Sequence, residues 1–256
     1  MDLATLYAQW KTLLVTGDAT FWQTFFVKFY QAFIESDRWM QYLKGVGTTL
    51  LVTALALVLG VILGVVVAVV RTAHDQQRPG HKNIFLSIIN GICKIYVTVI
   101  RGTPMMVQLL IMGMVIFASS RNFTAVGILT LGINSGAYVA EIIRGGLMSL
   151  DPGQAEAGRS LGLNYLDTMR FIVIPQAFKA ILPSLGNEFI ILLKDTSLIT
   201  VIGGKELLYA AQGIMGRTYE AMFPLIGTAI VYLALVMVFS WLQGKLERRL
   251  RQSDRR

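Results

Sequence analysis

Residues 45–70 read GVGTTLLVTALALVLGVILGVVVAVV, which is 26 residues without a charged side chain between Lys44 and Arg71. About 20 consecutive apolar residues are enough for a helix to cross the hydrocarbon core of a bilayer. The stretch therefore predicts a transmembrane helix. It begins too late in the chain, and its apolar region is too long, to be a secretory signal peptide.

Three more runs without charged side chains follow at residues 102–120, 122–140 and 221–244. Each predicts a further span, and we expect the first of them to begin upstream, near Ile84. A fifth candidate lies at residues 171–193. Lys179, Pro183 and Glu188 interrupt it, so it crosses only if these groups face protein or water. The sequence thus predicts an all-α integral membrane protein with about five transmembrane helices.

The composition supports this fold class. Of the 256 residues, 54% are apolar and 15% are charged, whereas soluble domains average about 45–50% and about 25%. These values argue against a soluble enzyme and against a disordered chain. The formal charge of +8 comes from 23 Lys and Arg against 15 Asp and Glu. Because it accompanies long uncharged runs, we attribute it to residues flanking membrane spans and not to nucleic-acid binding.

We expect no pattern for catalysis or metal binding in the sequence, and in particular no Gly-x-Ser-x-Gly nucleophile turn. The sequence has no phosphate-binding loop of the Gly-x4-Gly-Lys-Ser/Thr type. The single cysteine, Cys93, excludes an intrachain disulfide, and together with His74 and His81 it does not make a metal cluster. We expect no catalytic residue, no metal and no cofactor bound by this chain. Any energy source is then an ion gradient or a separate protein.

Basic residues predict the sidedness. The tail 245–256 contains six Lys or Arg, so we expect it in the cytoplasm. With five spans, the loops 71–83 and 144–170 also lie inside. The Arg121 turn, the segment 194–220 and the N-terminus then lie outside. The predicted transmembrane domain extends over residues 45–244.

Residues 1–44 are rich in aromatic side chains, with Trp10, Trp22 and Trp39 among them, and carry as many basic as acidic residues. This composition is typical of a helical segment that lies in the membrane interface. The alternative is a docking surface for a partner protein.

Farther along the chain, Gly60 and Gly64 are four residues apart in the first span, a spacing that allows close contact with another helix.

The segment 151–175, called the elbow below, reads DPGQAEAGRSLGLNYLDTMRFIVIP. Asp151 is a candidate N-cap, Pro152 fits the first helical position, and Gln154 completes a box-like pattern. Gly162 can end this helix with a positive φ, and Asn164 can cap a second helix. The elbow is then either a surface hairpin between two spans or a helix that enters a groove on another protein.

The elbow resembles the EAA loop of ATP-binding-cassette (ABC) importer permeases. Glu156, Ala157 and Gly158 occupy the Glu-Ala-Ala positions, Gly162 follows after three residues, and Ile-Val-Ile-Pro at 172–175 follows after nine more. In that family the first helix of the loop docks into a cleft of a cytoplasmic ATPase and transmits its closure. The resemblance assigns ATPase coupling to Ala155, Glu156, Ala157, Gly158, Ser160, Leu161 and Gly162.

Four further blocks resemble the branch of these permeases that takes up polar amino acids of the histidine, glutamine or arginine type. They are IRGTP at 100–104 with Val107 and Gln108, NSGAYVAEIIRGG at 134–146, LPSLGNE at 182–188 and KDTSL at 194–198. The resemblance covers about residues 45–250. It implies the type I importer (MetI-like) permease fold, with five core helices.

The same resemblance implies an assembly in the prokaryotic cytoplasmic membrane. Its expected partners are two ABC ATPase subunits, which use ATP and Mg, a second permease subunit, identical or homologous, an extracytoplasmic solute-binding protein, and membrane lipid. Two other functions stay open at this stage, a gradient-driven secondary transporter and a non-transporting membrane anchor.

Several polar residues in the predicted spans are candidates for the substrate path. Tyr138 and Glu141 share a helix face. The alternative for Glu141 is a structural ion pair with Arg144. The break predicted at residues 101–104 brings polar groups to a helix end. The alternative is a helix-packing turn in which the Arg101 side chain snorkels to the membrane interface. The full set is Thr103, Gln108, Asn134, Ser135, Tyr138, Glu141, Asn187, Asp195, Thr196 and Ser197. For the last three, helix capping and a Lys194–Asp195 pair are the alternative.

Overall fold

The computed structural model describes residues 2–77 and 83–253, and every regular element in these ranges is helical. The residues Arg78, His81 and Lys82 of the loop expected inside, and residues 254–256 of the basic tail, lie outside the described residues. Four helices are long and apolar enough to cross a membrane, namely Glu35–Asp75, Ile84–Gly102, Phe123–Met148 and Met222–Leu250. They correspond to α3 (Arg38–Asp75, with the turn before it), α4 (Ile84–Gly102), α6 (Phe123–Met148) and α11 (Met222–Ser253).

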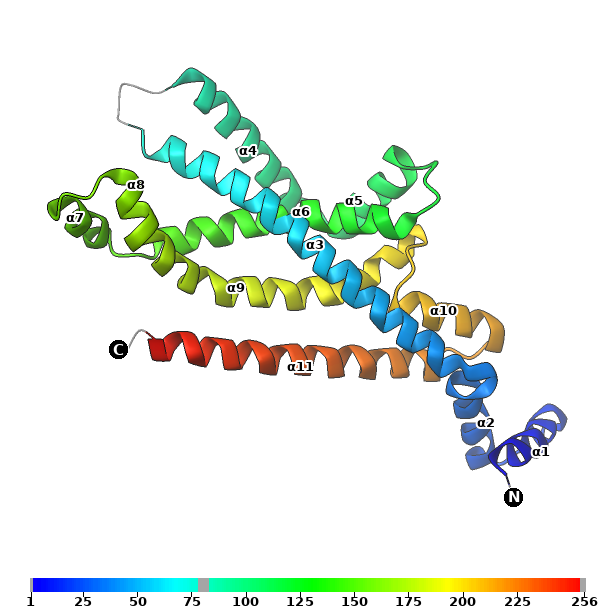
Figure 1. The fold of residues 1–256 in the computed structure, drawn as a ribbon. Coiled ribbons are helices and arrows are strands. Elements are labelled where there is room, and N and C mark those ends of the chain that lie inside the picture. Colours follow the sequence, from blue (N-terminus) through cyan, green and yellow to red (C-terminus); the bar gives the residue numbers. More distant parts are fainter. Residues whose placement is uncertain (1, 78–82, 254–256) are drawn as a thin grey trace.

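A fifth helix, α9 (Ile174–Asp195), runs beside α6 and α11 along the same direction (Figure 1). It contains Lys179, Pro183 and Glu188, and only Glu188 among them is buried. A 3-10 turn (Thr196–Ile202) and α10 (Leu207–Thr218) follow it. The all-α fold with about five membrane-crossing elements is confirmed.

The span expected near Ile84 to residue 120 is two helices. Helix α4 stops at Gly102, Thr103 is extended, and α5 (Met105–Leu110) then continues as a π-helical turn (Ile111–Ile116). The 12 residues after the break rise about 18 Å at 1.5 Å each, too little to cross alone. Pro104 causes the break, because proline lacks a backbone N–H and its ring displaces the preceding turn.

The most extensive helix contact joins α3 to α6. A Cβ atom built on Gly60 would lie 2.8 Å from the Ser135 hydroxyl, and one on Gly64 would lie 2.6 Å from a Val139 methyl. Gly132 and Gly136 of α6 receive the α3 side chains in the same way. Small residues let two backbones approach closely, and this approach supplies the packing that drives association in lipid. The contact predicted from Gly60 and Gly64 is confirmed.

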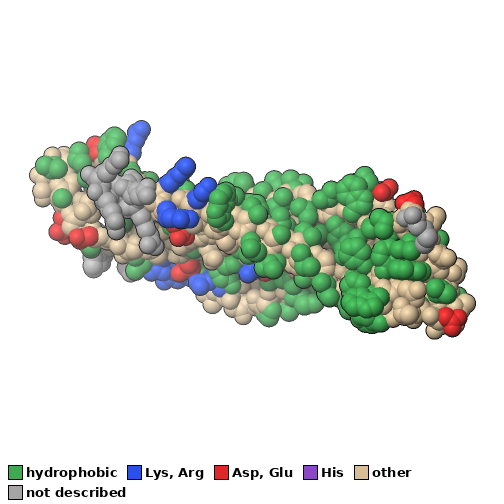
Figure 2. All heavy atoms as spheres, turned by 90° about the horizontal axis from the view of Figure 1, so that it is seen from below, with side chains coloured by type: hydrophobic (Ala, Val, Ile, Leu, Met, Phe, Trp, Pro, Cys, Tyr) green, Lys and Arg blue, Asp and Glu red, His purple; other side chains and the backbone are tan. Residues whose placement is uncertain are grey.

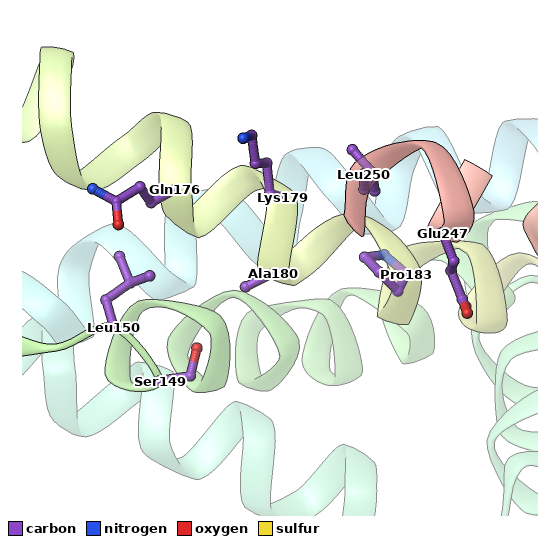
Figure 3. Close-up of a pocket in the computed structure, with 8 residues that line it drawn as sticks. All are labelled: Ser149, Leu150, Gln176, Lys179, Ala180, Pro183, Glu247 and Leu250. Carbon is purple, nitrogen blue, oxygen red and sulfur yellow. The ribbon is translucent and has the colours of Figure 1, made fainter. Parts of the chain in front are cut away.

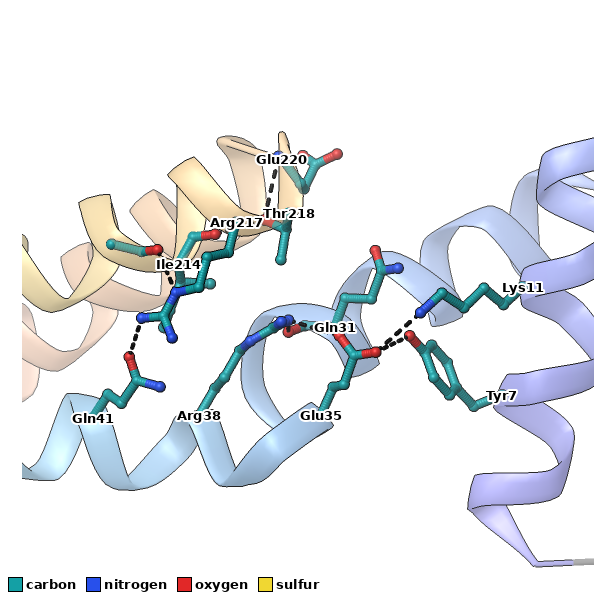
Figure 4. Close-up of polar contacts among 11 residues, drawn as sticks. Tyr7, Lys11, Gln31, Glu35, Arg38, Gln41, Ile214, Arg217, Thr218 and Glu220 are labelled. Atoms are coloured by element: carbon teal, nitrogen blue, oxygen red, sulfur yellow. Dashed lines mark hydrogen bonds and ion pairs between the residues drawn. The ribbon is translucent and has the colours of Figure 1, made fainter.

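The N-terminal segment forms two helices, α1 (Leu3–Thr16) and α2 (Phe21–Phe33), which pack against each other through stacked Tyr7 and Tyr30 rings. Helix α2 also packs against the start of α11, where Phe25 and Phe29 meet Phe223. Glu35, in the turn before α3, accepts hydrogen bonds from Tyr7 at 2.6 Å and Lys11 at 3.0 Å (Figure 4). The segment is therefore fixed to the helix bundle.

The elements divide between two ends of an elongated molecule. Helices α1, α2 and α10 gather at one end, and α7 (Pro152–Ser160), α8 (Tyr165–Thr168) and the C-terminus at the other (Figure 1). Hydrophobic side chains cover the middle, while most Lys and Arg visible in Figure 2 lie toward the end that carries α7. This grouping agrees with the loop sidedness expected from the sequence.

Replacement of Gly60 by Leu is expected to destabilise the protein by about 1–3 kcal/mol, because the added side chain collides with Ser135 and Gly136. The matched control is Gly47→Leu in the same helix, where an added Cβ meets nothing within 4 Å. Thermal unfolding in detergent compares the two. Equal midpoints for both variants would contradict the assigned contact.

A second prediction concerns the ion pair that ties α2 to the turn before α11, in which Lys28 lies 2.7 Å from Glu220. The Lys28 ammonium lowers the pKa of Glu220 from its ordinary 4.5, against a smaller opposing effect of burial. The folded-state pKa is below the unfolded one, so the pair stabilises the fold above pH 4.5 and the gain is lost as pH falls through the lowered pKa.

Because Lys28 is partly exposed, we expect Glu220→Gln to cost about 0.2–1 kcal/mol at pH 7. The difference from wild type shrinks on acidification, as measured by thermal unfolding at several pH values. A difference that grows toward acid would show that the sign is wrong.

Candidate functional site

The elbow begins with a capped helix. The Asp151 carboxylate accepts a hydrogen bond from the Gly153 N–H at 2.8 Å, and Pro152 occupies the first helical position of α7. The box with Gln154 is not formed, because the Gln154 side chain accepts from the Gln176 amide at 3.1 Å instead. The cap therefore depends on Asp151, while Gln154 ties α7 to the start of α9.

Glycine ends α7, as predicted. Gly162 has a φ of +83°, and the Leu163 N–H returns to the Gly158 carbonyl at 3.1 Å. Asn164 then caps α8 by accepting from the Asp167 N–H at 2.9 Å. Helix α8 continues through a π-helical turn (Met169–Val173) into α9. The elbow is thus a helix, a glycine turn and a second helix that is continuous with a membrane-crossing helix.

The two faces of α7 differ. Gly158 is buried against Thr168 and Ile172, which leaves no room for a Cβ there. Glu156 and Ala157, away from this contact, are exposed, and Leu161 at the end of the helix is 81% exposed. Of the remaining coupling candidates, Ala155 is half-buried and Ser160 and Gly162 are exposed. An exposed leucine beside small residues is typical of a surface that receives a partner.

The expectation that the sequence has no Gly-x-Ser-x-Gly pattern is wrong, because residues 158–162 have this spacing of hydrolase nucleophile turns. The structure does not support a nucleophile there. Ser160 sits in the last turn of α7, not on a strand-to-helix turn, and its hydroxyl donates to the Glu156 carbonyl at 3.0 Å.

The helix break between α4 and α5 is held by polar side chains. The Gln108 amide donates to the Thr103 hydroxyl at 2.8 Å and to the Ile100 carbonyl at 2.7 Å. On the other side, Asn134 of α6 donates to the Gln108 carbonyl oxygen at 2.9 Å. Three of the candidates, Thr103, Gln108 and Asn134, are therefore brought together, and they satisfy backbone groups that Pro104 leaves without partners.

Glu141 is part of a different ion pair from the one considered from the sequence. It contacts Arg71 of α3 directly and lies 3.8 Å from Arg101 of α4. The alternative pairing with Arg144 is wrong, because Arg144 lies 3.8 Å from Asp75 instead. Residues three apart share a helix face, but here the two side chains meet partners from other helices. Only the tertiary packing of α3 and α4 on α6 determines these partners.

Arg101 also lies over the Tyr138 ring, with 5.3 Å between the guanidinium carbon and the ring centre. The side chain therefore faces Tyr138 and Glu141 and is not simply snorkelling into the interface. Two arginines against one carboxylate leave this cluster with a formal charge of +1. The cluster joins α3, α4 and α6 in the membrane-crossing part of the chain.

Ser135 belongs to a buried link between α6 and α9. Its hydroxyl donates to Glu188 at 2.8 Å, and the two residues are 0% and 6% exposed. The hydroxyls of Thr196 and Ser197 donate to the carbonyls of Leu193 and Lys194, each at 2.8 Å. Thr196 and Ser197 therefore cap the end of α9, next to Asp195. The Lys194–Asp195 pair, which the sequence analysis gave as an alternative, is not among the ion pairs of the described residues.

Tyr138 and Asn187 line a cavity of about 550 Å³ between α6, α9 and α11, together with Gln243 and Glu247. A second cavity of about 540 Å³ lies next to it, toward the end that carries α7, and Pro183 and Glu247 line both. Figure 3 shows Gln176, Lys179 and Glu247 around this second cavity. Polar side chains thus follow one route along α9.

The sequence analysis missed the contribution of α11. Gln243 donates to the Pro183 carbonyl and to Glu247, each at 3.1 Å. Gln243 is the polar residue near the end of an uncharged run, and Glu247 is an acid within a basic tail. Both were weak signals that a search for polar groups one turn apart at the end of a span would have detected.

The family is shown by a direct match. Residues 83–252 fit the family described as "Binding-protein-dependent transport system inner membrane component". This chain belongs to that family. It is the permease subunit of an ABC importer for amino acids.

Individual relatives agree with the assignment. The permease is 39% identical to the glutamine transport system permease protein GlnP of Escherichia coli K12, over 64% of this chain and 77% of the relative. It is 35% identical to the arginine transport system permease protein ArtQ of Bacillus subtilis, over 67% and 85%.

Solved structures show the same fold. A crystal structure of an amino acid ABC transporter with histidines matches with a TM-score of 0.73 and 40% identity, over 82% of this chain and 94% of that chain. The methionine transporter MetNI, in an inward-facing form, matches with a TM-score of 0.69 at 18% identity, over 85% and 99%. The type I importer fold expected from the resemblance is confirmed.

A double-mutant cycle tests the arginine cluster of the permease. Glu141→Gln leaves Arg71 and Arg101 without their carboxylate and is expected to lower the thermal midpoint. Arg71→Gln added to Glu141→Gln is expected to recover part of that loss, with a coupling energy of about 0.5–3 kcal/mol. The control pair Glu141→Gln and Arg144→Gln is expected to be additive. Coupling in the control pair alone would refute the pairing described above.

Proposed function

We propose that this permease imports a polar amino acid and that the elbow couples it to a separate ATPase. The observation that carries the proposal is the two-faced helix α7, which is packed on one side and bare on the other. Its sequence has the spacing of the EAA loop. The names of GlnP and ArtQ, which are glutamine and arginine transport permeases, support the substrate class.

The elbow has a structural route to the transport helices. Helix α8 is continuous with α9, and α9 lines both polar cavities. A displacement of α7 therefore reaches Pro183 and Asn187 through the contact of Gly158 with Thr168 and Ile172, which lie in the helical stretch that continues into α9. In this mechanism an ATPase moves α7, and the two permease halves rock between inward-facing and outward-facing states.

The proposed assembly contains two ATPase subunits, which use ATP and Mg, a second permease subunit, identical or homologous, and an extracytoplasmic solute-binding protein. The family description, a binding-protein-dependent transport component of the inner membrane, supports this list. The lack of a phosphate-binding loop in the sequence agrees with ATP hydrolysis in a partner.

For the orientation, we assign the end with α7 and the C-terminus to the cytoplasm of a prokaryotic cell, and the end with the N-terminus to the outside. Lys and Arg gather toward the α7 end, as the positive-inside rule requires. The N-terminal unit, α1 and α2, then meets the outer membrane surface. The 73% exposed rings of Phe21 and Trp22 support an interfacial position for it.

The proposed substrate path follows the cavity lined by Tyr138 and Asn187 and the neighbouring cavity lined by Lys179. Thr103, Gln108 and Asn134 support the helix break beside it, and Ser135 and Glu188 hold α6 to α9. Asp195, Thr196 and Ser197 lie at the outer end of α9, where a gate would stand. Glu141 does not by itself select a cationic substrate, because two arginines compensate its charge.

Two substitutions in the elbow test coupling. Gly162→Ala places a side chain at a φ of +83°, which costs about 1–2 kcal/mol locally, and Glu156→Lys reverses the charge on the bare face of α7. Both are expected to reduce co-purification of the ATPase. The matched controls are Gly17→Ala, at a φ of +85°, and Asp18→Lys, both exposed at the opposite end. Controls that reduce co-purification equally would show a general folding effect.

Uptake into liposomes tests the function itself. The permease is reconstituted with its ATPase and solute-binding protein, and a panel of amino acids is offered with ATP, without ATP, and with an imposed ion gradient. We expect ATP-dependent uptake of a polar amino acid. Uptake by the permease alone under a gradient would indicate a secondary transporter, and no uptake under any condition would indicate an anchor.

A further inference from the structure

Two cavities meet where the elbow joins α3. The first, of about 540 Å³, lies between α3, α6 and α9. The second, of about 390 Å³, lies between the end of α3 and the elbow helices α7 and α8. The residues lining both are Thr72, Gln76, Leu147, Tyr165 and Met169, so the two cavities form one continuous cleft. Each volume is in the range of known ligand sites, about 300–1,000 Å³.

The first cavity is apolar and faces the membrane. Valine, isoleucine, leucine, phenylalanine and alanine supply most of its lining, and among the described residues no charged side chain lines it. Val69 and Phe178, on opposite walls, are 61% and 57% exposed. Figure 1 places this region beside the crossing helices α3 and α9. A cavity of this chemistry at membrane depth accommodates a hydrocarbon chain and excludes a polar amino acid.

The second cavity has a mixed lining, in which Thr72, Gln76 and one charged residue stand beside apolar side chains. Arg159 of α7 is the charged residue that lines it, and within the described part of the chain Arg159 has no ion-pair, hydrogen-bond or ring partner. Thr168 of α8 also lines it. Thr168 is 3% exposed, and its buried hydroxyl has no partner among the described residues. The unpaired guanidinium of Arg159 favours a ligand that has negatively charged oxygen atoms, and the Thr168 side chain forms part of the wall beside it.

Tyr165 and Gln76 mark the boundary between the two cavities. The Tyr165 hydroxyl donates to the Gln76 side chain, and this bond links α8 to the end of α3. The polar residues therefore gather at the elbow end of the cleft, and the apolar residues extend from there toward the middle of the membrane. This order, charged end first and apolar region second, matches an amphiphile with one end in each cavity.

We propose that this cleft binds one phospholipid with an anionic headgroup. Its phosphate lies beside Arg159 and Thr168, and one acyl chain lies against Val69 and Phe178. The bound lipid bridges the elbow to α3 and α9, because its headgroup contacts α7 and α8 and its chain contacts Val69 of α3 and Phe178 of α9. This inference goes beyond the proposed transport function and does not depend on the identity of the amino acid.

Native mass spectrometry of the full-length permease tests the site. The purified protein is titrated with phosphatidylglycerol and with phosphatidylcholine of identical acyl chains. We expect one retained phosphatidylglycerol for each permease chain, bound roughly tenfold more tightly than phosphatidylcholine, the difference typical of a charge-assisted contact with arginine. Equal affinity for the two lipids would overturn the anionic headgroup preference.

Variants assign the binding to this cleft. Arg159→Gln is expected to abolish the preference for phosphatidylglycerol, and Val69→Trp is expected to reduce retention of both lipids by filling the apolar cavity. The matched controls are Arg248→Gln, whose guanidinium contacts only its own helix, and Val58→Trp, at a 57% exposed position of α3 outside the cleft. Thermal unfolding confirms that each variant is folded. Retention that is unchanged in both cleft variants would refute the site.

Two further outcomes separate lipid from other occupants. Inorganic phosphate at millimolar concentration is expected not to displace the lipid, because the acyl chain contributes to binding. Displacement by phosphate would show a simple anion site. If Val69→Trp instead abolishes permease dimers and leaves lipid retention intact, the cleft receives a second copy of the chain, and the lipid proposal is wrong.

Discussion

The close approach of α3 and α6 is the contact on which the rest of the structure depends. In a bilayer the surrounding lipid is as apolar as leucine, so helices associate through packing and polar contacts and not through exclusion of water. Gly60 and Gly64 on one helix, and Gly132 and Gly136 on the other, provide this packing. Helix α6 then holds Asn134, Ser135, Tyr138 and Glu141 in fixed positions relative to α3, α4, α5 and α9.

Polar groups inside the bundle are arranged so that few are left without partners. The break at Pro104 frees carbonyls, and Gln108 binds them while also accepting from Asn134. Glu188 accepts from Ser135, and Glu141 faces two arginines. An isolated charge in hydrocarbon is costly, so paired or hydrogen-bonded groups are the stable solution. The same groups that hold the helices together thus lie beside the cavities where a polar solute would pass.

Helix α9 connects the two functional regions. Its first residues continue from the elbow, its middle lines both polar cavities, and its last turn is capped by Thr196 and Ser197. The position of α9 in the bundle explains why its apolar sequence contains charged residues. Glu188 is buried against Ser135, while Lys179 lines a cavity, so neither has to lie in hydrocarbon. The charged residues that interrupt the apolar run of α9 are therefore compatible with a membrane-crossing helix.

The sequence by itself determined the membrane class, the approximate spans, the capped helix and glycine turn of the elbow, and the family. These features are local: an uncharged run, a capping residue or a motif spacing depends only on neighbouring residues. Only the tertiary structure decided that Glu141 pairs with Arg71 and Arg101 and not with Arg144, and that Gln243 and Glu247 of α11 share a cavity with Tyr138. Such partners come from different helices, and their meeting depends on the rotation and depth at which each helix packs, which no single stretch of sequence encodes.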